Sequence, residues 1–307
     1  MGQNVIHLYI NFWNEIRDVE IWDVKMNENI ICKKTQDDLI KKLNNPPLFS
    51  IIIPTYNESQ NIVNLVDSIY SCVKDQGCYE IVIIDDNSPD CKVEKIIEAF
   101  NEKKGFNLYK IRDTVGIQSH SHFFIYPLAE ESFFIKIVKR KERSGLISAI
   151  YEGFKSSISE YLIVMDADFS HTPIHINNLM REIRKSNCDL VIASRYLKGG
   201  RIIGWTSKRI FYSKFATNLS RLLFRLSNVS DPMSGFFVTK RDVVRKMEFN
   251  TSGFKILLEI LVKSKSIKIK EIPYTFTDRA NGSSKLNSKV TIDFFKSLYI
   301  LHKHNSV

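Results

Sequence analysis

The fold is decided by three apolar runs, each of which ends in carboxylates: FSIIIPTYNE (49–58), YEIVIIDDNSPD (79–90) and EYLIVMDADFS (160–170). Short runs rich in Ile and Val that stop abruptly at polar turn residues are typical of buried parallel strands. In an α/β sheet, ligands collect at the carboxyl ends of such strands. The sequence therefore predicts one acidic edge of the sheet, formed by Glu58, Asp85, Asp86, Asp166 and Asp168.

From Phe49 onward, the pattern alternates between strands and helices. We expect strands at 49–53, 80–84, 134–138, 161–165 and 189–193. We expect helices at about 59–74, 92–104, 146–157 and 174–186. This alternation predicts βαβ units and an α/β fold, with a mostly parallel sheet and helices on both faces. The stretch 105–133 interrupts the rhythm, and Gly116 and Pro127 lead us to interpret it as an irregular surface insertion.

The domain organisation follows from these boundaries. Residues 1–47 form an amino-terminal extension that ends at Asn44-Asn45-Pro46-Pro47, a typical break between structural units. Residues 48–288 form the α/β domain, and residues 289–307 form a carboxy-terminal amphipathic helix.

The composition of the chain indicates which classes of partner it favours. The 307 residues carry 44 Lys and Arg against 34 Asp and Glu, a formal charge of +10 that favours phosphates, nucleic acid or an acidic membrane surface. No apolar run reaches the roughly 18 to 20 residues that span a bilayer, and no secretory signal is visible. The five cysteines show no metal-binding spacing, which favours a reducing, cytosolic setting.

The segment Asp166-Ala167-Asp168 carries the strongest chemical signal. In extended backbone, residues two apart leave on the same face, so both carboxylates can share a hard cation such as Mg²⁺ or Mn²⁺. The alternative is turn chemistry, with Asp166 capping a turn. Asp85 and Asp86 could likewise belong to an Asx turn, and Glu58 could be a first-turn acid favoured by the helix dipole.

A basic, amphipathic segment follows the last predicted strand. Between Leu190 and Ser230 there are eight basic residues and no acidic one. Apolar residues alternate with them at helical spacing: Ile210, Phe211, Phe215, Leu219, Leu222, Leu223 and Phe224. Such a helix suits a membrane interface, and the alternative is a helix packed on the α/β domain. The carboxy-terminal helix shows a similar pattern and leaves the same two alternatives open.

Several motifs together resemble a known family. PTYNE (54–58), IIDDNSPD (83–90), DADFSHTP (166–173) and SRYLKGG (194–200) are similar to motifs of the inverting family 2 glycosyltransferases. NTSGFKILLEIL (250–261) and DRANGSSKL (278–286) narrow the resemblance to the dolichol-phosphate mannosyltransferases. The resemblance runs from about Leu48 to about Leu286. It implies a GT-A fold and transfer of mannose from GDP-mannose to dolichyl or another polyprenyl phosphate in a membrane.

The resemblance also implies roles for individual residues. The guanosine part of the donor would be bound by Pro54, Tyr56, Glu58, Ile84 and Asp86. The donor diphosphate and the metal would be held by Asp166, Ala167 and Asp168, with Ser170 as a further metal ligand where relatives have Gln or Ser. Phosphate groups or the sugar would be met by Arg195, Arg209, Ser213, Lys255, Arg279 and Lys285. Of these, we expect Arg195, Arg209 and Ser213 to hold the acceptor phosphate, and Asp166, Asp168, Arg195 and Arg209 to be catalytic.

The implied reaction is a single displacement with inversion, which gives a β-mannosyl phospholipid. The lipid phosphate is already ionised near neutral pH, so a strong general base is not required. A related enzyme with a UDP-glucose-type donor and a lipid-phosphate or glycan acceptor is the alternative. A non-catalytic nucleotide or nucleic-acid binder is more distant, and we expect no nucleic-acid partner. The expected location is peripheral, on the cytoplasmic side of a membrane, with a small membrane subunit as a conceivable partner.

Overall fold

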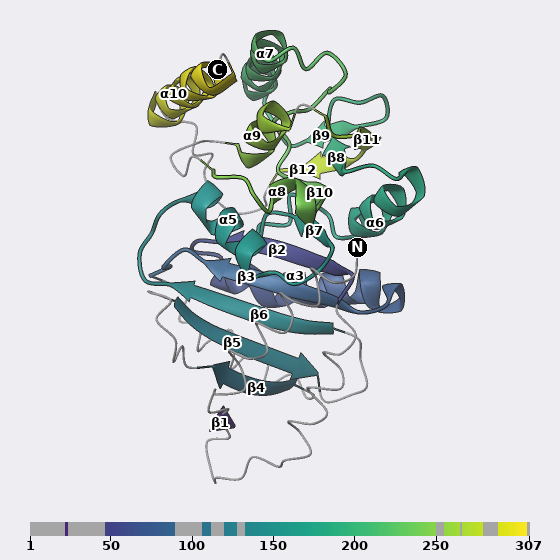
Figure 1. The fold of residues 1–307 in the computed structure, drawn as a ribbon, viewed down its shortest axis with the longest axis vertical. Coiled ribbons are helices and arrows are strands. Elements are labelled where there is room, and N and C mark those ends of the chain that lie inside the picture. Colours follow the sequence, from purple (N-terminus) through teal and green to yellow (C-terminus); the bar gives the residue numbers. More distant parts are fainter. Residues whose placement is uncertain are drawn as a thin grey trace.

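The structure is a computed structural model that describes residues 22–23, 47–89, 106–111, 120–127, 133–249, 255–264, 266–278 and 288–305 (Figure 1). Its main sheet has the strand order β1-β4-β5-β6-β3-β2-β7-β10-β8-β11. The strands are β1 (Trp22–Asp23), β2 (Phe49–Thr55), β3 (Tyr79–Asp85), β4 (Phe106–Ile111), β5 (His120–Pro127), β6 (Phe133–Arg140), β7 (Tyr161–Val164), β8 (Leu190–Ser194), β10 (Phe237–Lys240) and β11 (Ile269–Pro273). A second sheet pairs β9 (Arg201–Ile203) in parallel with β12 (Thr275–Thr277).

Helices pack on both faces of the main sheet. They are α3 (Ser59–Val73), α5 (Leu146–Ser156), α6 (Ile174–Ser186), α7 (Ser207–Leu223), α8 (Arg241–Val244), α9 (Ile256–Lys263) and α10 (Ser288–Asn305), with a 3₁₀ turn η1 at Lys74–Gln76. The predicted strands and helices that fall within the described residues are confirmed, with ends shifted by a few residues at most. The helix expected at 92–104 and most of residues 1–47 lie outside the described residues.

The alternation of side chains along the central strands creates two cores. In β2, Ile51 and Ile53 face the core formed with α3 and α6, whereas Ile52 faces the core formed with α5, α9 and α10. Successive side chains of a strand point to opposite faces, so an Ile-rich strand fills both cores at once. This explains why the central strands read as continuous apolar runs.

Two features differ from the sequence-based expectation. The sheet is mostly parallel, as predicted, but β10 runs antiparallel between β7 and β8. The interpretation of 105–133 as irregular is wrong for its described part, because β5 pairs antiparallel with β6, and β4 pairs antiparallel with β5. Pro127 is the last residue of β5, a strand-end position that proline tolerates.

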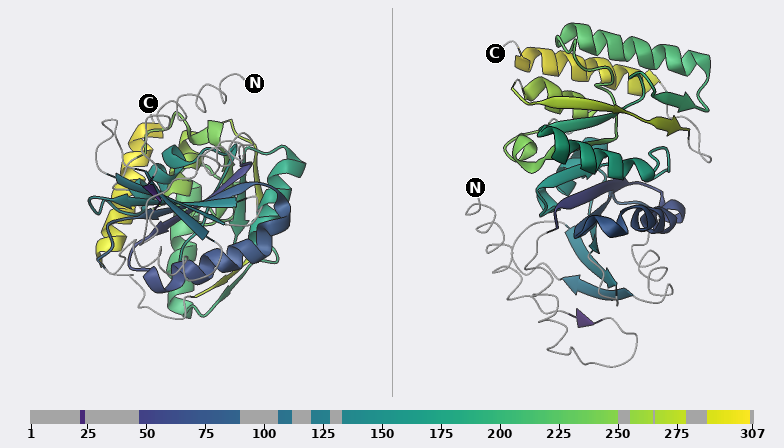
Figure 2. Two further views of the ribbon diagram at one scale, coloured as in Figure 1. Left: turned by 90° about the horizontal axis from the view of Figure 1, so that it is seen from below. Right: turned by 90° about the vertical axis from the view of Figure 1, so that its right-hand side faces the viewer.

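Two helices with exposed apolar side chains lie at the end of the molecule away from β4 (Figures 1 and 2). These residues, which we call the α7–α10 apolar surface, are Phe211, Tyr212, Phe215, Leu222, Leu223, Phe295, Tyr299 and Ile300, each between 38% and 78% exposed. The inward side of α7 instead carries the small buried residues Thr217 and Ser220. Phe294, Leu298 and Leu301 attach α10 to the core. Within the described part of the chain, no helix has both the length and the apolar character to cross a bilayer.

The closest approach of α5 to β2 gives a stability prediction. A Cβ atom added at Gly153 would lie 2.4 Å from Ile52 Cγ2. Gly153→Ala should lower the free energy of unfolding by about 1–3 kcal/mol, because overpacking outweighs the roughly 1 kcal/mol that alanine gains in helix propensity. Urea denaturation measures the difference.

The control is Asn64→Ala at an exposed position of α3, where we expect a change within about 0.5 kcal/mol. Combining Gly153→Ala with Ile52→Ala removes the opposing methyl group, so the two losses should not add. Strict additivity in the double variant would contradict the close approach.

Candidate active site

The carboxyl ends of three neighbouring strands meet at one edge of the main sheet. β2 pairs in parallel with β3 on one side and with β7 on the other. Just past the ladder, the Asp86 N–H donates to the Thr55 carbonyl at 3.0 Å, which ties the two strand ends together. The segments that carry Glu58, Asp86 and Asp166 therefore leave adjacent strands in the same direction.

Asp86 is a buried carboxylate that joins neighbouring segments. Its Oδ1 accepts hydrogen bonds from Arg140 Nη1 at 2.6 Å and from the Ser144 N–H at 3.0 Å, and its Oδ2 accepts from the Gly145 N–H at 2.8 Å. A carboxylate can accept about four hydrogen bonds, so three acceptor positions are taken. Asp86 thus holds the end of β6 and the start of α5 in place.

Tyr56 and Glu58 form a more accessible part of the same edge. The Arg143 guanidinium lies 3.8 Å from the centroid of the Tyr56 ring, a cation–π contact between two loops. Glu58 is the N-cap residue of α3, and its Oε2 accepts a hydrogen bond from Asn61 Nδ2 at 2.7 Å. A partly exposed aromatic ring and a carboxylate are suitable contacts for a nucleobase and its N–H donors.

The Asp166–Ser170 segment follows β7, and the buried residue Ala167 attaches it to the core. Ala167 is buried, whereas the side chain of Asp166 is 39% exposed and Asp168 is partly exposed. The Ser170 N–H donates to Asp168 Oδ1 at 3.1 Å, which restrains that carboxylate. Two carboxylates two residues apart therefore remain open to a ligand.

His171 follows this segment and contacts Asp166 from the buried side. Its Nδ1 accepts a hydrogen bond from the Asp166 N–H at 2.9 Å. Burial lowers the pKa of the His171 imidazole, although the charges of Asp166 and Asp168 act to raise it. Since the ordinary histidine pKa is about 6.5, the ring is uncharged at neutral pH.

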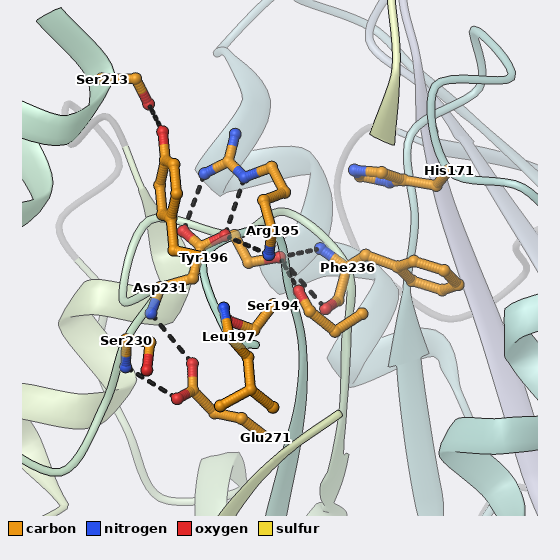
Figure 3. A network of polar contacts seen from close by, with 12 residues as sticks. His171, Ser194, Arg195, Tyr196, Leu197, Ser213, Ser230, Asp231, Phe236 and Glu271 are labelled. Carbon is orange, nitrogen blue, oxygen red and sulfur yellow. Dashed lines mark hydrogen bonds and ion pairs between the residues drawn. The ribbon is translucent and has the colours of Figure 1, made fainter. Parts of the chain in front are cut away.

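Arg195 is held by a buried ion pair rather than standing alone (Figure 3). Its Nε and Nη2 donate to the two carboxylate oxygens of Asp231, each at 2.8 Å, and its backbone N–H donates to Asp231 Oδ2 at 3.0 Å. Burial alone would lower the pKa of Arg195, but the Asp231 charge outweighs it and raises the pKa. The Asp231 loop is in turn fixed by Glu271, which accepts the N–H groups of Ser230 and Asp231 at 2.7 and 2.9 Å.

A lysine interacts with Asp166, and an arginine of α7 lies within electrostatic range of that lysine. Lys255 precedes α9 within electrostatic range of Asp166, Arg195 and Arg209; burial lowers the pKa of its ammonium group, while the Asp166 charge acts to raise it. Arg209 on α7 donates through Nη1 to Asp278 Oδ2 at 2.7 Å, and its guanidinium lies 4.2 Å from the centroid of the Trp205 ring. The edge thus combines accessible carboxylates with three nearby cationic groups.

The donor atoms at this edge fit a hard divalent cation that is shared with a ligand. Among the described residues, no group of three or more His, Cys, Asp and Glu side chains is arranged to hold a metal ion by itself. Asp166 and Asp168 supply carboxylate oxygens, which Mg²⁺ and Mn²⁺ prefer, and such ions usually keep water and substrate phosphates as further ligands. Ser170 is only 2% exposed, so its hydroxyl would reach an ion from the buried side.

The remaining predicted residues lie as follows. Pro54 and Ile84 are buried within β2 and β3. Ser213 on α7 accepts a hydrogen bond from the Tyr196 hydroxyl at 2.7 Å. Arg279 and Lys285 lie outside the described residues.

Sequence reasoning missed the partners of the site residues. It assigned no contact to Asp231, which is fully buried and holds Arg195. It also assigned no contact to Arg140, the buried partner of Asp86. An arginine at the end of an apolar strand was the one available signal, because a buried charge requires a partner.

Comparison with known proteins identifies the family of this chain. The family model described as "Glycosyl transferase family 2" matches residues 50–119 and 120–248. The chain is 37% identical over 255 residues to a dolichol-phosphate mannosyltransferase of Pyrococcus furiosus, covering 83% of this chain and 63% of that protein. It is 28% identical over 265 residues to the Saccharomyces cerevisiae dolichol-phosphate mannosyltransferase, covering 83% and 86%. The chain therefore spans less than two thirds of the length of the archaeal relative.

Solved structures share the fold at low sequence identity. A mannosyltransferase from Pyrobaculum calidifontis, solved with GDP-Man and Mn²⁺, has a TM-score of 0.53 and 17% identity and covers 99% of this chain and 72% of its own. Glucosyl-3-phosphoglycerate synthase from Mycobacterium tuberculosis has a TM-score of 0.55 and 14% identity, with coverage of 91% and 86%. Its structure contains Mn²⁺ and UDP. With the family model matching most of the α/β domain, this chain belongs to glycosyl transferase family 2 and has a GT-A fold.

Proposed function

We propose that this protein transfers mannose from GDP-mannose to dolichyl or another polyprenyl phosphate, with inversion at the anomeric carbon. The observation that carries the proposal is that the accessible Asp166 carboxylate lies within electrostatic range of Lys255, which in turn lies within range of Arg195 and Arg209. The identity to dolichol-phosphate mannosyltransferases along most of the chain supports this choice of substrates.

The donor would lie along the edge formed by β2, β3 and β7. Its nucleobase would contact Tyr56 and Glu58, and its diphosphate would reach Asp166 and Asp168 together with Mg²⁺ or Mn²⁺. When bound, the metal neutralises charge on the departing diphosphate and orients it. Two solved structures with the same fold contain Mn²⁺, which supports a divalent ion at this site.

The acceptor phosphate would approach from the side of α7. Arg209 and Lys255 would place its oxygen against the anomeric carbon and offset the repulsion between two anionic substrates. Arginine suits this role because its planar guanidinium binds phosphate oxygens in pairs. Arg195 already makes two side-chain bonds to Asp231, so it would contribute through its remaining Nη1.

The α7–α10 apolar surface would bring the enzyme to its lipid substrate. Exposed Lys208, Lys214 and Arg225 accompany the aromatic residues of α7 and its C-cap region. Apolar side chains in the lipid boundary and cations near anionic headgroups are the combination expected for an interfacial helix. We propose that this surface docks peripherally on a membrane, and that α7 presents Arg209 to the lipid phosphate there.

The metal ligands can be tested directly. Asp168→Asn should keep the fold but lower the transfer rate roughly 100-fold or more, because a metal contributes several kcal/mol of charge stabilisation. The measurement is transfer of labelled mannose to a short polyprenyl phosphate, with and without Mn²⁺. Asp75→Asn, at an exposed position in η1, is the control and should match the wild type. Full activity of Asp168→Asn would exclude this residue as a metal ligand.

Donor choice separates the proposal from its alternative. In the presence of Mn²⁺, GDP-mannose should bind at least about tenfold more tightly than UDP-glucose, a difference of about 1.4 kcal/mol. Guanine offers adjacent N–H donors to the carboxylates at this edge, whereas uracil offers a single one. Titration calorimetry compares the two donors. A preference for UDP-glucose would replace the proposed reaction with that of a glucosyltransferase.

Membrane docking predicts a surface-specific loss of vesicle binding. Phe211→Asp combined with Phe215→Asp should weaken binding to anionic vesicles at least about tenfold, because burying each phenyl group contributes about 1.5–3 kcal/mol. Vesicle co-flotation measures this. Leu146→Asp, which changes an exposed apolar residue of α5, is the matched control and should bind normally. If the Phe211/Phe215 double variant bound anionic vesicles as well as the Leu146 variant, this surface would be ruled out as the docking site.

A further inference from the structure

The imidazole of His171 is fixed tightly beside the proposed metal ligands. It is 2% exposed and stacks on Phe236 with ring centroids 5.0 Å apart and planes 14° apart (Figure 3). The edges of Tyr274 and Phe276 approach it, each with centroids 6.0 Å away. Gly235 closes another side, since a Cβ added there would lie 3.1 Å from His171 Cε1. These contacts leave the ring little freedom to rotate.

The hydrogen bonding of His171 defines which nitrogen carries its proton. Nδ1 accepts from the Asp166 N–H at 2.9 Å, so it presents a lone pair. A neutral imidazole then carries its proton on Nε2. Nε2 lies 3.7 Å from Asp166 Oδ2, beyond hydrogen-bond length but with its N–H dipole near the carboxylate. One ring therefore contacts Asp166 at both its backbone and its side chain.

We infer that His171 is a positioning residue that sets the orientation of the Asp166 carboxylate toward a divalent cation. This inference rests on the proposed metal-dependent function. Groups that orient a metal ligand from behind commonly affect metal affinity about 10- to 100-fold when they are removed. His171 needs no contact with substrate for this role, because it acts through Asp166.

His175 shows that aromatic packing alone does not require this arrangement. It lies on α6, edge-on to Tyr274 with centroids 5.7 Å apart, and burial lowers the pKa of its imidazole. Its Nδ1 makes no hydrogen bond within the described part of the chain. His175 therefore offers a matched control: a partly buried histidine against the same tyrosine, without the contact to Asp166.

Two substitutions separate the two contacts of His171. His171→Asn places an amide oxygen near the position of Nδ1 and removes the Nε2–H. His171→Gln can place an amide N–H near Nε2 and removes the acceptor at Nδ1. His175→Asn is the control. Titration calorimetry would measure Mn²⁺ affinity in the presence of GDP, and GDP affinity without metal, for the full chain and each variant.

We expect both His171 variants to weaken Mn²⁺ binding about 10- to 100-fold. Metal-free GDP binding should stay unchanged, and His175→Asn should match the wild type in both measurements. Wild-type Mn²⁺ affinity in both His171 variants would overturn the inference. A wild type that binds GDP but no Mn²⁺ would overturn the proposed metal site, and the inference with it.

A measurement on the unaltered protein covers the case in which a variant does not fold. Nitrogen-15 NMR of histidine-labelled protein distinguishes a ring protonated on Nε2 from one protonated on Nδ1. For the His171 ring, identified by nuclear Overhauser contacts with the stacked Phe236 ring, we expect the Nε2–H form. A proton on Nδ1 would exclude the hydrogen bond from Asp166 and overturn the inference.

Discussion

The acidic edge depends on two buried carboxylate–arginine pairs, beside which other carboxylates are accessible to a ligand. Asp86 pairs with Arg140, and Asp231 pairs with Arg195, with all four side chains at most 8% exposed. Removing one partner of such a pair leaves an uncompensated buried charge and typically costs about 3–5 kcal/mol. The pairs therefore organise the loops, while Asp166 and Asp168, which are more exposed, remain available for chemistry.

Whether the sequence could predict a part of this site depends on how far apart in the chain the interacting residues are. The strand ends were predictable because a buried parallel strand has a local sequence pattern, namely an apolar run that stops at turn residues. β10 was not among the predicted strands, and its direction could not be predicted, since the alternation of side chains is the same in a parallel and an antiparallel strand. The Arg195–Asp231 pair joins residues 36 positions apart, and no local pattern identifies such a partner. His171 and Asp166 are only five positions apart, but their contact depends on how the loop between them closes.

The amphipathic helix shows a second limit, which concerns orientation. The sequence of α7 predicts one apolar and one basic face, but it does not say which face meets the domain. The structure buries Thr217 and Ser220 and exposes Phe211 and Phe215. Small residues let the helix lie close to the domain, so its aromatic residues are left on the outside. For α10 the structure shows one core-facing side and one exposed side, because Phe294 packs in the core while its neighbour Phe295 is exposed.

A short chain of contacts connects this exposed helix to the acidic edge. Tyr196 follows Arg195 in sequence, and its hydroxyl donates to Ser213 on α7. On the same helix, Arg209 pairs with Asp278, the residue after β12. The helix that would meet the membrane is thus attached at two points, to the segments that follow β8 and β12. If α7 docks on a bilayer, these attachments rather than a flexible tether set the height of Asp166 above the lipid. A phosphate at the membrane surface would then meet the donor at a distance fixed by the fold.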